Sequence, residues 1–413
     1  MRVVVIGAGI VGITTAWWLH RAGHEVEVID RQPGAGLETS WGNGALQHAS
    51  AVEPWSAPGV WKEIVRSLGR TDAPMLLRPS ALPKMWRWGL SFLRNCRAER
   101  HHAHALGNLR LAFESLDGMA AIREATGIDY ERRPGRVLRI YGTEAAFDAG
   151  KAEYAPLQEA GLLVETLDRA ALVERDPVLA TMRGPLAGGF AFPQDELGDC
   201  HLFCDRLAGW LAGRGVRFRW STKVRGLAME RGRLVAVQTD QGRIATETAV
   251  VATGAWLNGL LGTVGLRVPL WPIKGVSLTT PRDRWPDGPR HGLLDNERHM
   301  VIVPIGEDRL RVAGSAEITG FDTTPDPARI KASVDRVSAL FPQFAACVAD
   351  PRAVSWAGLR PVTPAGVPLT GRTRVAGLWV NGGHGHTGWT LGCGSSRRLA
   401  AMLNGDLPPA EVT

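Results

Sequence analysis

The stretch VVVIGAGIVGITTAWWL, residues 3–19, decides the fold. Residues 3–6 form a short apolar run that is typical of a buried strand, and a glycine-rich turn follows at once. Residues 13–22 have the composition of a helix that ends at a glycine, and HEVEVID, residues 24–30, then alternates as a second strand. The pattern predicts a right-handed βαβ unit at the start of the chain.

The turn between the first strand and the helix has the spacing G-x-G-x-x-G. Its first glycine permits a tight bend, its second lets backbone approach a pyrophosphate, and its third lets helix and strand pack closely. Phosphates would then lie at the helix N-terminus, where free N–H groups favour negative charge. An acid eighteen residues later suits ribose hydroxyls and disfavours a 2′-phosphate, although the arginine beside it leaves NADP open. The predicted contacts are Gly7, Gly9, Ile10, Val11, Gly12, Asp30 and Arg31.

The composition is that of an ordinary globular protein of 413 residues, with 45% hydrophobic and 22% charged residues. This length favours two domains. The five cysteines form no C-x-x-C pair, which favours reduced thiols and a cytoplasmic location. The net charge of +7 is spread over scattered arginines without a basic run, so we expect no nucleic-acid partner and a preference for anionic ligands.

The rest of the chain alternates between two kinds of segment. Residues 202–213 suggest a helix, residues 215–224 a strand, residues 233–244 a hairpin, and TAVVATGAW (248–256) a buried strand, which returns the chain to the first sheet. The stretches in between suit an inserted substrate domain. We therefore predict a discontinuous first domain of residues 1–73, 199–265 and 351–413, and a second domain of residues 74–198 and 266–350.

Several further motifs, in order along the chain, resemble one known family. ETSWGNGA (38–45), IKGVSLT (273–279), WAGLRPVTPAG (356–366) and NGGHGHTGWTLGCGSSR (381–397) join the opening glycine motif in a collinear set over nearly the whole chain. Together they resemble the FAD-dependent D-amino acid oxidase superfamily, and within it the D-amino acid dehydrogenase branch.

The resemblance implies an α/β plus α+β fold in which a Rossmann-type FAD-binding domain is interleaved with an antiparallel-sheet substrate domain. FAD would lie at their junction. Glycines near the C-terminus would let backbone approach the flavin ring, and the helix after them would direct its N-terminal dipole at the negative charge that develops on reduction. The further cofactor contacts that the resemblance implies are Ser40, Asn43, Gly44, Val224, Thr253, Gly254, Gly358, Gly383, His384, Gly385, Thr387, Gly388 and Trp389.

Arg360, in GLRP, is the residue that the resemblance assigns to the substrate carboxylate. A guanidinium presents two parallel N–H donors that match a carboxylate, which explains the choice of residue. His48 ends the segment of residues 38–48, which we call the flavin loop because the resemblance places it along FAD. There it could tune amine protonation or be a satisfied polar residue. Leu46 and Ala51 stand where the family commonly has glutamine and tyrosine, and no tyrosine lid can be assigned. The substrate side chain therefore stays open.

The implied reaction is oxidative deamination of a D-amino acid, in which hydride passes from Cα to flavin N5 and electrons pass to a respiratory, quinone or dye-like acceptor. An oxidase or dehydrogenase of glycine, sarcosine or another secondary amine is the alternative on the same fold. A nicotinamide-dependent dehydrogenase and a basic binding protein without catalysis remain as more distant alternatives.

Two other stretches invite different interpretations. RHHAHAL (100–106) and GHGHTG (383–388) contain paired histidines, but neither offers a complete ligand set, so we predict no metal site. RPSALPKMWRWGLSFLRNCR (78–97) mixes aromatic, aliphatic and basic residues, which suits either peripheral contact with the inner face of the cell membrane or a helix packed on the substrate domain.

Overall fold

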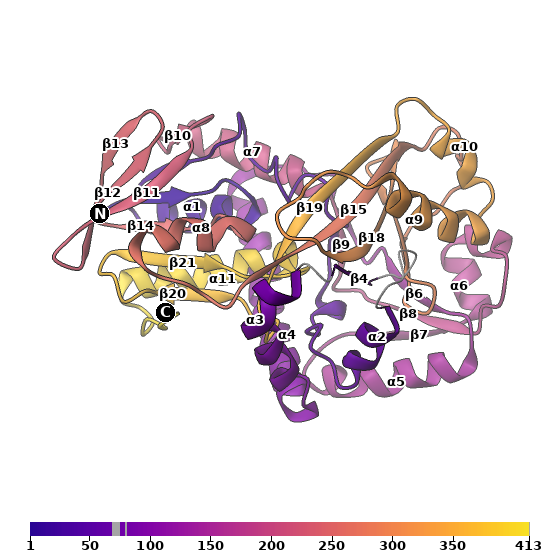
Figure 1. The fold of residues 1–413 in the computed structure, drawn as a ribbon. Helices are drawn as coiled ribbons and strands as arrows, with labels where there is room; N and C mark the ends of the chain where they lie inside the picture. Colours follow the sequence, from indigo (N-terminus) through magenta and orange to yellow (C-terminus); the bar gives the residue numbers. More distant parts are fainter. Residues whose placement is uncertain (68–74, 79–80, 413) are drawn as a thin grey trace.

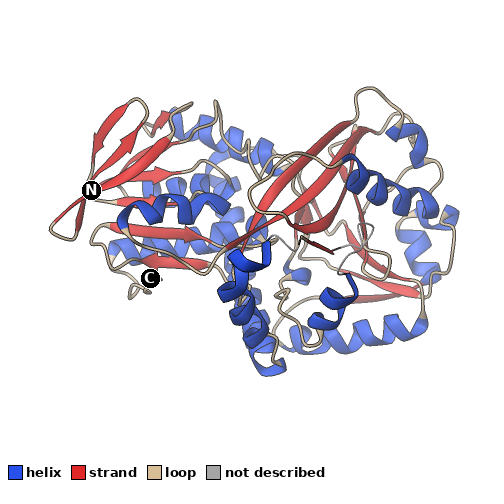
Figure 2. Cartoon of the chain, viewed as in Figure 1, coloured by secondary structure: helices blue, strands red, loops and turns tan. Residues whose placement is uncertain are grey.

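The computed structural model describes the chain except for residues 68–74, 79–80 and 413. Two bodies are visible in Figure 1: a six-stranded sheet with both chain termini on the left, and a nine-stranded sheet on the right. Helices flank the sheets of both bodies (Figure 2). The predicted combination of a Rossmann-type domain with a second, largely antiparallel domain is confirmed.

The six-stranded sheet begins with the predicted βαβ unit, β1 (Arg2–Ile6), α1 (Ile10–Arg21) and β2 (Glu25–Ile29). The strand order is β10-β2-β1-β14-β21-β20, and every pair is parallel except β20 with β21. Alternate residues of β1 face opposite layers, which is why its whole run is apolar. Val3 and Val5 pack toward α1 and α7, and Val4 and Ile6 pack toward α8 and the hairpin strands.

The predicted strand over residues 215–224 is wrong as a single element. It consists of β10 (Arg217–Arg219), a turn, and the start of β11 (Val224–Glu230). The two strands separate because β10 pairs with β2, whereas β11 pairs with β12 in a three-stranded sheet that covers one face of the first body. Ser221, with a φ of 49°, lies in the turn between them.

The nine-stranded sheet has the order β19-β15-β18-β17-β16-β6-β8-β7, and β4 pairs with β18. Its pairs are antiparallel except β16 with β6 and β18 with β4. β19 (Val354–Val362) pairs with β15 (Trp271–Pro281) along its length, although it falls in the segment predicted for the first domain. By strand pairing we propose to draw that boundary after Val362 instead of at residue 351.

Long helices join the two bodies. α4 (Ala98–Thr126) packs against α11 (Gly388–Asn404), where the backbone of Leu111 comes so close to Gly394 that a Cβ there would lie 2.6 Å from the Leu111 carbonyl oxygen. α4 lies in the segment predicted for the second domain but packs against α11 of the first domain, so it joins the two. The other elements are β3 (Leu46–Gln47), α2 (Val60–Ser67), β4 (Met75–Leu77), α3 (Leu82–Asn95), β5 (Arg133–Pro134), β6 (Val137–Tyr141), α5 (Glu144–Glu159), β7 (Glu165–Asp168), α6 (Arg169–Arg175), β8 (Gly188–Ala191), β9 (Glu196–Leu197), α7 (Cys200–Ala212), β12 (Arg233–Thr239), β13 (Gly242–Ala245), β14 (Ala249–Val251), α8 (Leu257–Leu261), β16 (Gly292–Asp295), β17 (Met300–Ile305), β18 (Arg309–Ile318), α9 (Pro327–Leu340), α10 (Phe344–Val348), β20 (Leu369–Arg372) and β21 (Leu378–Gly382).

Gly12→Ala should destabilise the chain, because a Cβ at Gly12 would overlap the carbonyl oxygen of Gly7 in the first turn. We expect a loss of about 1–3 kcal/mol from this overpacking, measured by denaturant unfolding with FAD present. Gly209→Ala is the matched control, since Gly209 lies in α7 with nothing within 4 Å of the added methyl group. A Gly12→Ala variant as stable as the control would contradict the close packing.

Candidate active site

The first glycine turn forms an open cradle at the N-terminus of α1. Gly7 has a φ of 105°, a conformation that favours glycine, and its position leaves no room for a side chain beside the Ala252 carbonyl. The α1 N-terminus has neither a capping side chain at Gly9 nor an acid in its first turn, which suits an anion.

Two predicted contact residues brace this turn from outside. Asp30 accepts hydrogen bonds from the backbone N–H of Ala8 at 2.6 Å and of Gln32 at 2.8 Å, and Ser40 accepts one from Ile10 at 3.1 Å. Burial raises the pKa of Asp30. Each carboxylate oxygen keeps a second lone pair, so Asp30 can bind a ribose hydroxyl while it holds the turn.

Arg31 is already engaged on the protein. Its guanidinium donates to Glu38 at 2.7 and 2.9 Å and lies 4.5 Å from the centroid of the Trp256 ring. These contacts compete with the 2′-phosphate of NADP for the same side chain.

The strand ends beside the cradle carry the second group of predicted residues. Thr253 and Gly254 follow β14 after Ala252, and Thr253 lies next to Gly7. The buried hydroxyl of Thr253 has no hydrogen-bond partner. Val224 begins β11, where it pairs with Thr239. The structure thus brings Thr253 and Gly254 to the turn, whereas Val224 lies at the end of the adjoining small sheet.

The glycine-rich loop before α11 meets the end of β19. Gly385 donates its N–H to the Pro361 carbonyl at 2.9 Å, and His384 forms an isolated bridge with Val362. His384 contacts the Ser395 hydroxyl through Nε2 at 2.8 Å, while its Nδ1 and the indole nitrogen of Trp389 are buried without partners. Burial lowers the pKa of His384 to about 3, so the ring is neutral at pH 7.

Arg360 lies on β19 directly beside this loop. Its guanidinium fills the space above Gly275, where any Cβ would overlap it, and donates to the Ser315 carbonyl at 2.9 Å. Its Cζ lies 5.6 Å from the centroid of the Trp55 ring. Among the described residues no carboxylate forms an ion pair with Arg360. Burial lowers its pKa to about 10, an effect that Glu317 opposes.

Trp55 also stacks on His386, with ring centroids 5.0 Å apart and an angle of 14° between the ring planes. The two aromatic rings therefore border Arg360 from segments that are far apart in sequence. Trp55 and Gly275 were not among the site residues predicted from the sequence. The motifs VEPW and IKG, which contain them, were the available signals.

A single loop, residues 38–48, connects the cradle to the nine-stranded sheet. Ser277 donates to the Gly42 carbonyl at 2.9 Å, and Arg311 donates to the Asn43 carbonyl at 3.0 Å. At the end of this loop His48 donates its backbone N–H to the Thr390 hydroxyl at 3.2 Å. Burial, assisted by His386 and Arg139, lowers the pKa of His48 to about 3, so this side chain is a neutral group at pH 7.

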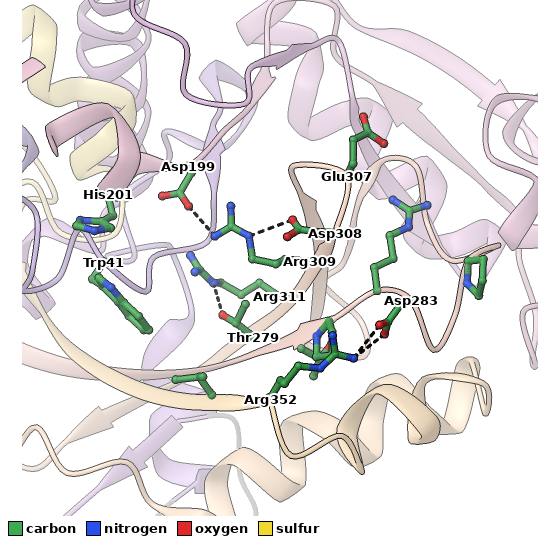
Figure 3. A pocket seen from close by; sticks show the side chains of 15 residues that line it. Trp41, Asp199, His201, Thr279, Asp283, Glu307, Asp308, Arg309, Arg311 and Arg352 are labelled. Carbon is green, nitrogen blue, oxygen red and sulfur yellow. Dashed lines mark hydrogen bonds and ion pairs between the residues drawn. The ribbon is translucent and has the colours of Figure 1, made fainter. Parts of the chain in front are cut away.

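A cavity of about 720 Å³ opens beside the same loop (Figure 3). Trp41 and Arg311 line it, with Arg309 held by Asp199 at 2.9 Å. Burial lowers the pKa of Arg311 to about 10. None of the predicted site residues lines this cavity, so it is distinct from the surroundings of Arg360.

Among the described residues, no group of three or more histidine, cysteine, aspartate or glutamate side chains could hold a metal ion. None of the helices found in that part of the chain is long and apolar enough to cross a membrane.

A family model described as "FAD dependent oxidoreductase" (DAO) matches residues 2–402. The chain belongs to this family. It is 41% identical over 406 residues to a D-amino acid dehydrogenase of Paramagnetospirillum magneticum, covering 98% of this chain and 95% of that one, and 40% identical over 404 residues to one of Sinorhizobium medicae, covering 98% and 96%.

Two solved structures share the fold of this FAD-dependent oxidoreductase. Glycine oxidase from Geobacillus kaustophilus matches with a TM-score of 0.76 at 22% identity, covering 100% of this chain and 98% of that one. L-proline dehydrogenase from P. horikoshii matches with a TM-score of 0.74 at 17% identity, covering 98% and 93%. At these identities the similarity shows the fold alone.

The residues around the cradle fit FAD. The α1 N-terminus, without an acid in its first turn, suits the pyrophosphate. The buried, unpartnered polar atoms of Thr253, His384 and Trp389 lie in the segments predicted to follow the cofactor. Leaving such an atom unsatisfied costs about 1–3 kcal/mol, which a bound ligand can relieve.

His48 and His384 should each reduce the stability of the holoprotein as the pH decreases from 7 toward 4. Their pKa is about 3 in the folded chain and near 6.5 in the unfolded chain, so through these groups the unfolded chain binds more protons. Glu53 and Asp195, whose pKa burial raises to about 7, act in the opposite direction, so the test is a comparison of variants. Melting temperatures are measured at several pH values with excess FAD. Relative to wild type, His384→Asn should become more stable toward pH 4, whereas His102→Asn, at an exposed position of α4, should follow wild type. Equal slopes in all three proteins would contradict the burial argument.

Proposed function

We propose that this FAD-dependent oxidoreductase oxidises a D-amino acid to the 2-oxo acid and ammonia. The observation that carries the proposal is the guanidinium of Arg360, which has no acid partner among the described residues and lies between Trp55 and the glycine-rich loop. The D-amino acid dehydrogenases that match over nearly the full chain support the choice of substrate.

Arg360 would bind the substrate carboxylate through its parallel N–H donors and fix Cα at the flavin. Bound FAD supplies the electron sink, since it accepts hydride from Cα at N5. The product imine then hydrolyses in water to the 2-oxo acid and ammonia. The oxidation at Cα needs no protein base if the substrate amine is already neutral.

Neutral surroundings favour the neutral amine. Burial lowers the pKa of His48 to about 3 and that of His386 to about 4, with Arg360 adding to the effect at His386, so neither imidazole carries charge at pH 7. Each can then offer a nitrogen lone pair to an amine N–H. The N-terminus of α11, which begins at Gly388 without an acidic residue in its first turn, would stabilise the negative charge that the reduced ring acquires.

Removal of Arg360 should weaken substrate binding without emptying the flavin site. Arg360→Met loses a paired, charge-assisted interaction worth about 3 kcal/mol, so we expect the substrate concentration for half-maximal anaerobic flavin reduction to rise about 100-fold. Stopped-flow absorbance with D- and L-amino acids, glycine and sarcosine measures this and distinguishes the secondary-amine alternative. Arg372→Met, at an arginine paired with Glu411 on the surface, is the control. Reduction of Arg360→Met at wild-type substrate concentrations would overturn the anchoring role.

We further propose that electrons pass to a respiratory quinone or a similar acceptor and that the chain contacts an anionic membrane surface through α2 and α3. Both helices pack onto one apolar cluster by their inner faces. Their outer faces expose Trp61, Val65, Trp86, Leu90 and Leu93, next to basic residues such as Lys62, Lys84 and Arg87. Apolar side chains flanked by positive charge favour the interface of an acidic bilayer.

Vesicle sedimentation tests the membrane contact. Wild-type protein should bind vesicles with about 30% anionic lipid and release at high salt, because the surface charges are then screened. A Trp61→Ser, Trp86→Ser double variant should lose most of this binding while flavin reduction by substrate is kept. Leu163→Ser, at an exposed apolar position outside these helices, is the control. Equal binding by all three proteins would exclude α2 and α3 as the contact surface.

A further inference from the structure

Five polar side chains, two from residues 48–53 and three from the substrate domain, lie within electrostatic reach of one another. We call them the interior polar cluster. Four of them have a side-chain atom that is buried without a hydrogen-bond partner: His48 (Nδ1), Glu53 (Oε1), Arg139 (Nε) and Tyr154 (OH). The fifth, Tyr141, hydrogen-bonds Arg139 through its hydroxyl.

Arg139 is the most costly member. It is 4% exposed, and among the described residues no carboxylate forms an ion pair with it. Its guanidinium hydrogen-bonds Tyr141 and lies 5.4 Å from the centroid of the Tyr154 ring, but its Nε has no hydrogen-bond partner. Burial acts to lower the pKa of Arg139, whereas Tyr154 and Glu53 outweigh it and raise that pKa. The guanidinium therefore stays charged and has an N–H left for an acceptor.

The nearby acids do not offset this charge fully at neutral pH. Burial raises the pKa of Glu53 to about 7, and it raises the pKa of Asp195 to about 7 against hydrogen bonds from Ser50. Both carboxyl groups are thus partly protonated at pH 7. Arg139 keeps an unmet demand for an acceptor oxygen.

Strand registers place Arg139 on the face of the nine-stranded sheet that meets the flavin loop. Arg139 is paired with Leu294, and Leu294 with Val301, so these side chains share a face. Two residues along from Val301, Val303 is paired with Arg311, which donates to the Asn43 carbonyl of the flavin loop. The same face therefore carries both the loop contact and Arg139.

The cluster is also continuous with the surroundings of Arg360. Trp55 lies against Arg360 and stacks on His386, and Glu53 stands two residues before Trp55 in the chain. His386, beside Arg360, and Arg139 both act electrostatically on His48. His48 therefore lies between the predicted carboxylate anchor and Arg139.

We propose that the interior polar cluster receives the side chain of the amino-acid substrate and selects side chains that end in a carboxamide or carboxylate oxygen. This inference rests on the proposed function. Arg139 would donate to the terminal oxygen, and the two tyrosines would complete its hydrogen bonds. An apolar side chain of equal size would leave these groups buried and unsatisfied, which is the strongest basis for discrimination.

Pairs of substrates with nearly equal shape test the selection. D-glutamine is compared with D-methionine, and D-asparagine with D-leucine, with D-glutamate and D-aspartate as the charged counterparts, by kcat/KM with a dye acceptor. We expect wild type to favour the oxygen-bearing member of each pair at least about tenfold. Arg139→Met should lower kcat/KM for D-glutamine and D-glutamate about 100-fold, mostly through KM, and change D-methionine by less than about threefold.

Arg136→Met is the matched control, because Arg136 precedes the same strand and is exposed. Flavin content and melting temperature check folding. If that variant does not fold, Glu53→Gln gives a second test. Removal of this acid should raise kcat/KM for D-glutamate relative to D-glutamine.

Three results would overturn the proposal: a wild-type preference for D-methionine and D-leucine, an equal effect of Arg139→Met on both members of a pair, or an unchanged ratio of D-glutamate to D-glutamine in Glu53→Gln. Any of these results would show that the cluster does not select the substrate side chain and would leave buried water as its partner. Oxidation of D-methionine would still support the proposed function. If no D-amino acid reduces the flavin, the proposed function fails and this inference fails with it.

Discussion

The candidate site is organised around a buried positive charge, that of Arg360, which forms no ion pair with a carboxylate among the described residues. Arg360 fits against Gly275 at a point where any side chain would displace its guanidinium, and one backbone carbonyl, that of Ser315, accepts from it. Burial makes the charge costly, as its lowered pKa indicates, and Glu317 offsets this only in part. A site that tolerates this cost suits a ligand that brings a carboxylate.

Two backbone segments hold the two domains around that charge. The flavin loop, residues 38–48, is bound to the nine-stranded sheet through Ser277 and Arg311, and the glycine-rich loop is bound to β19 through the Gly385 N–H. Most of these bonds involve backbone carbonyl or N–H groups of the loops. They fix the path of the chain past the predicted flavin site while leaving side-chain atoms such as the Thr253 hydroxyl free for the cofactor.

The sequence was most informative where the structure depends on residues that lie close together in the chain. The βαβ unit, the hairpin at β12 and β13, and α11 could all be predicted, because glycine spacing and apolar periodicity are local. The motif around Arg360 pointed to the site through a family resemblance. What the sequence did not reveal depends on sheet register and on distant segments meeting. The stacking of Trp55 on His386 and the shared face of Arg139 and Leu294 follow from pairing that no short motif encodes. The division of residues 215–224 between two sheets has the same origin.

Binding of 2-methylalanine tests the central claim most directly, because this amino acid has the carboxylate and amine of a substrate but no hydrogen on Cα to transfer. It should perturb the absorbance of the oxidised flavin in a saturable manner without reducing it. The account predicts that Arg360→Lys weakens this binding and that Arg360→Met weakens it about 100-fold, as expected for the loss of a paired, charge-assisted interaction. Equal affinity in wild type and Arg360→Met would contradict the claim that the charge of Arg360 is there for a substrate carboxylate.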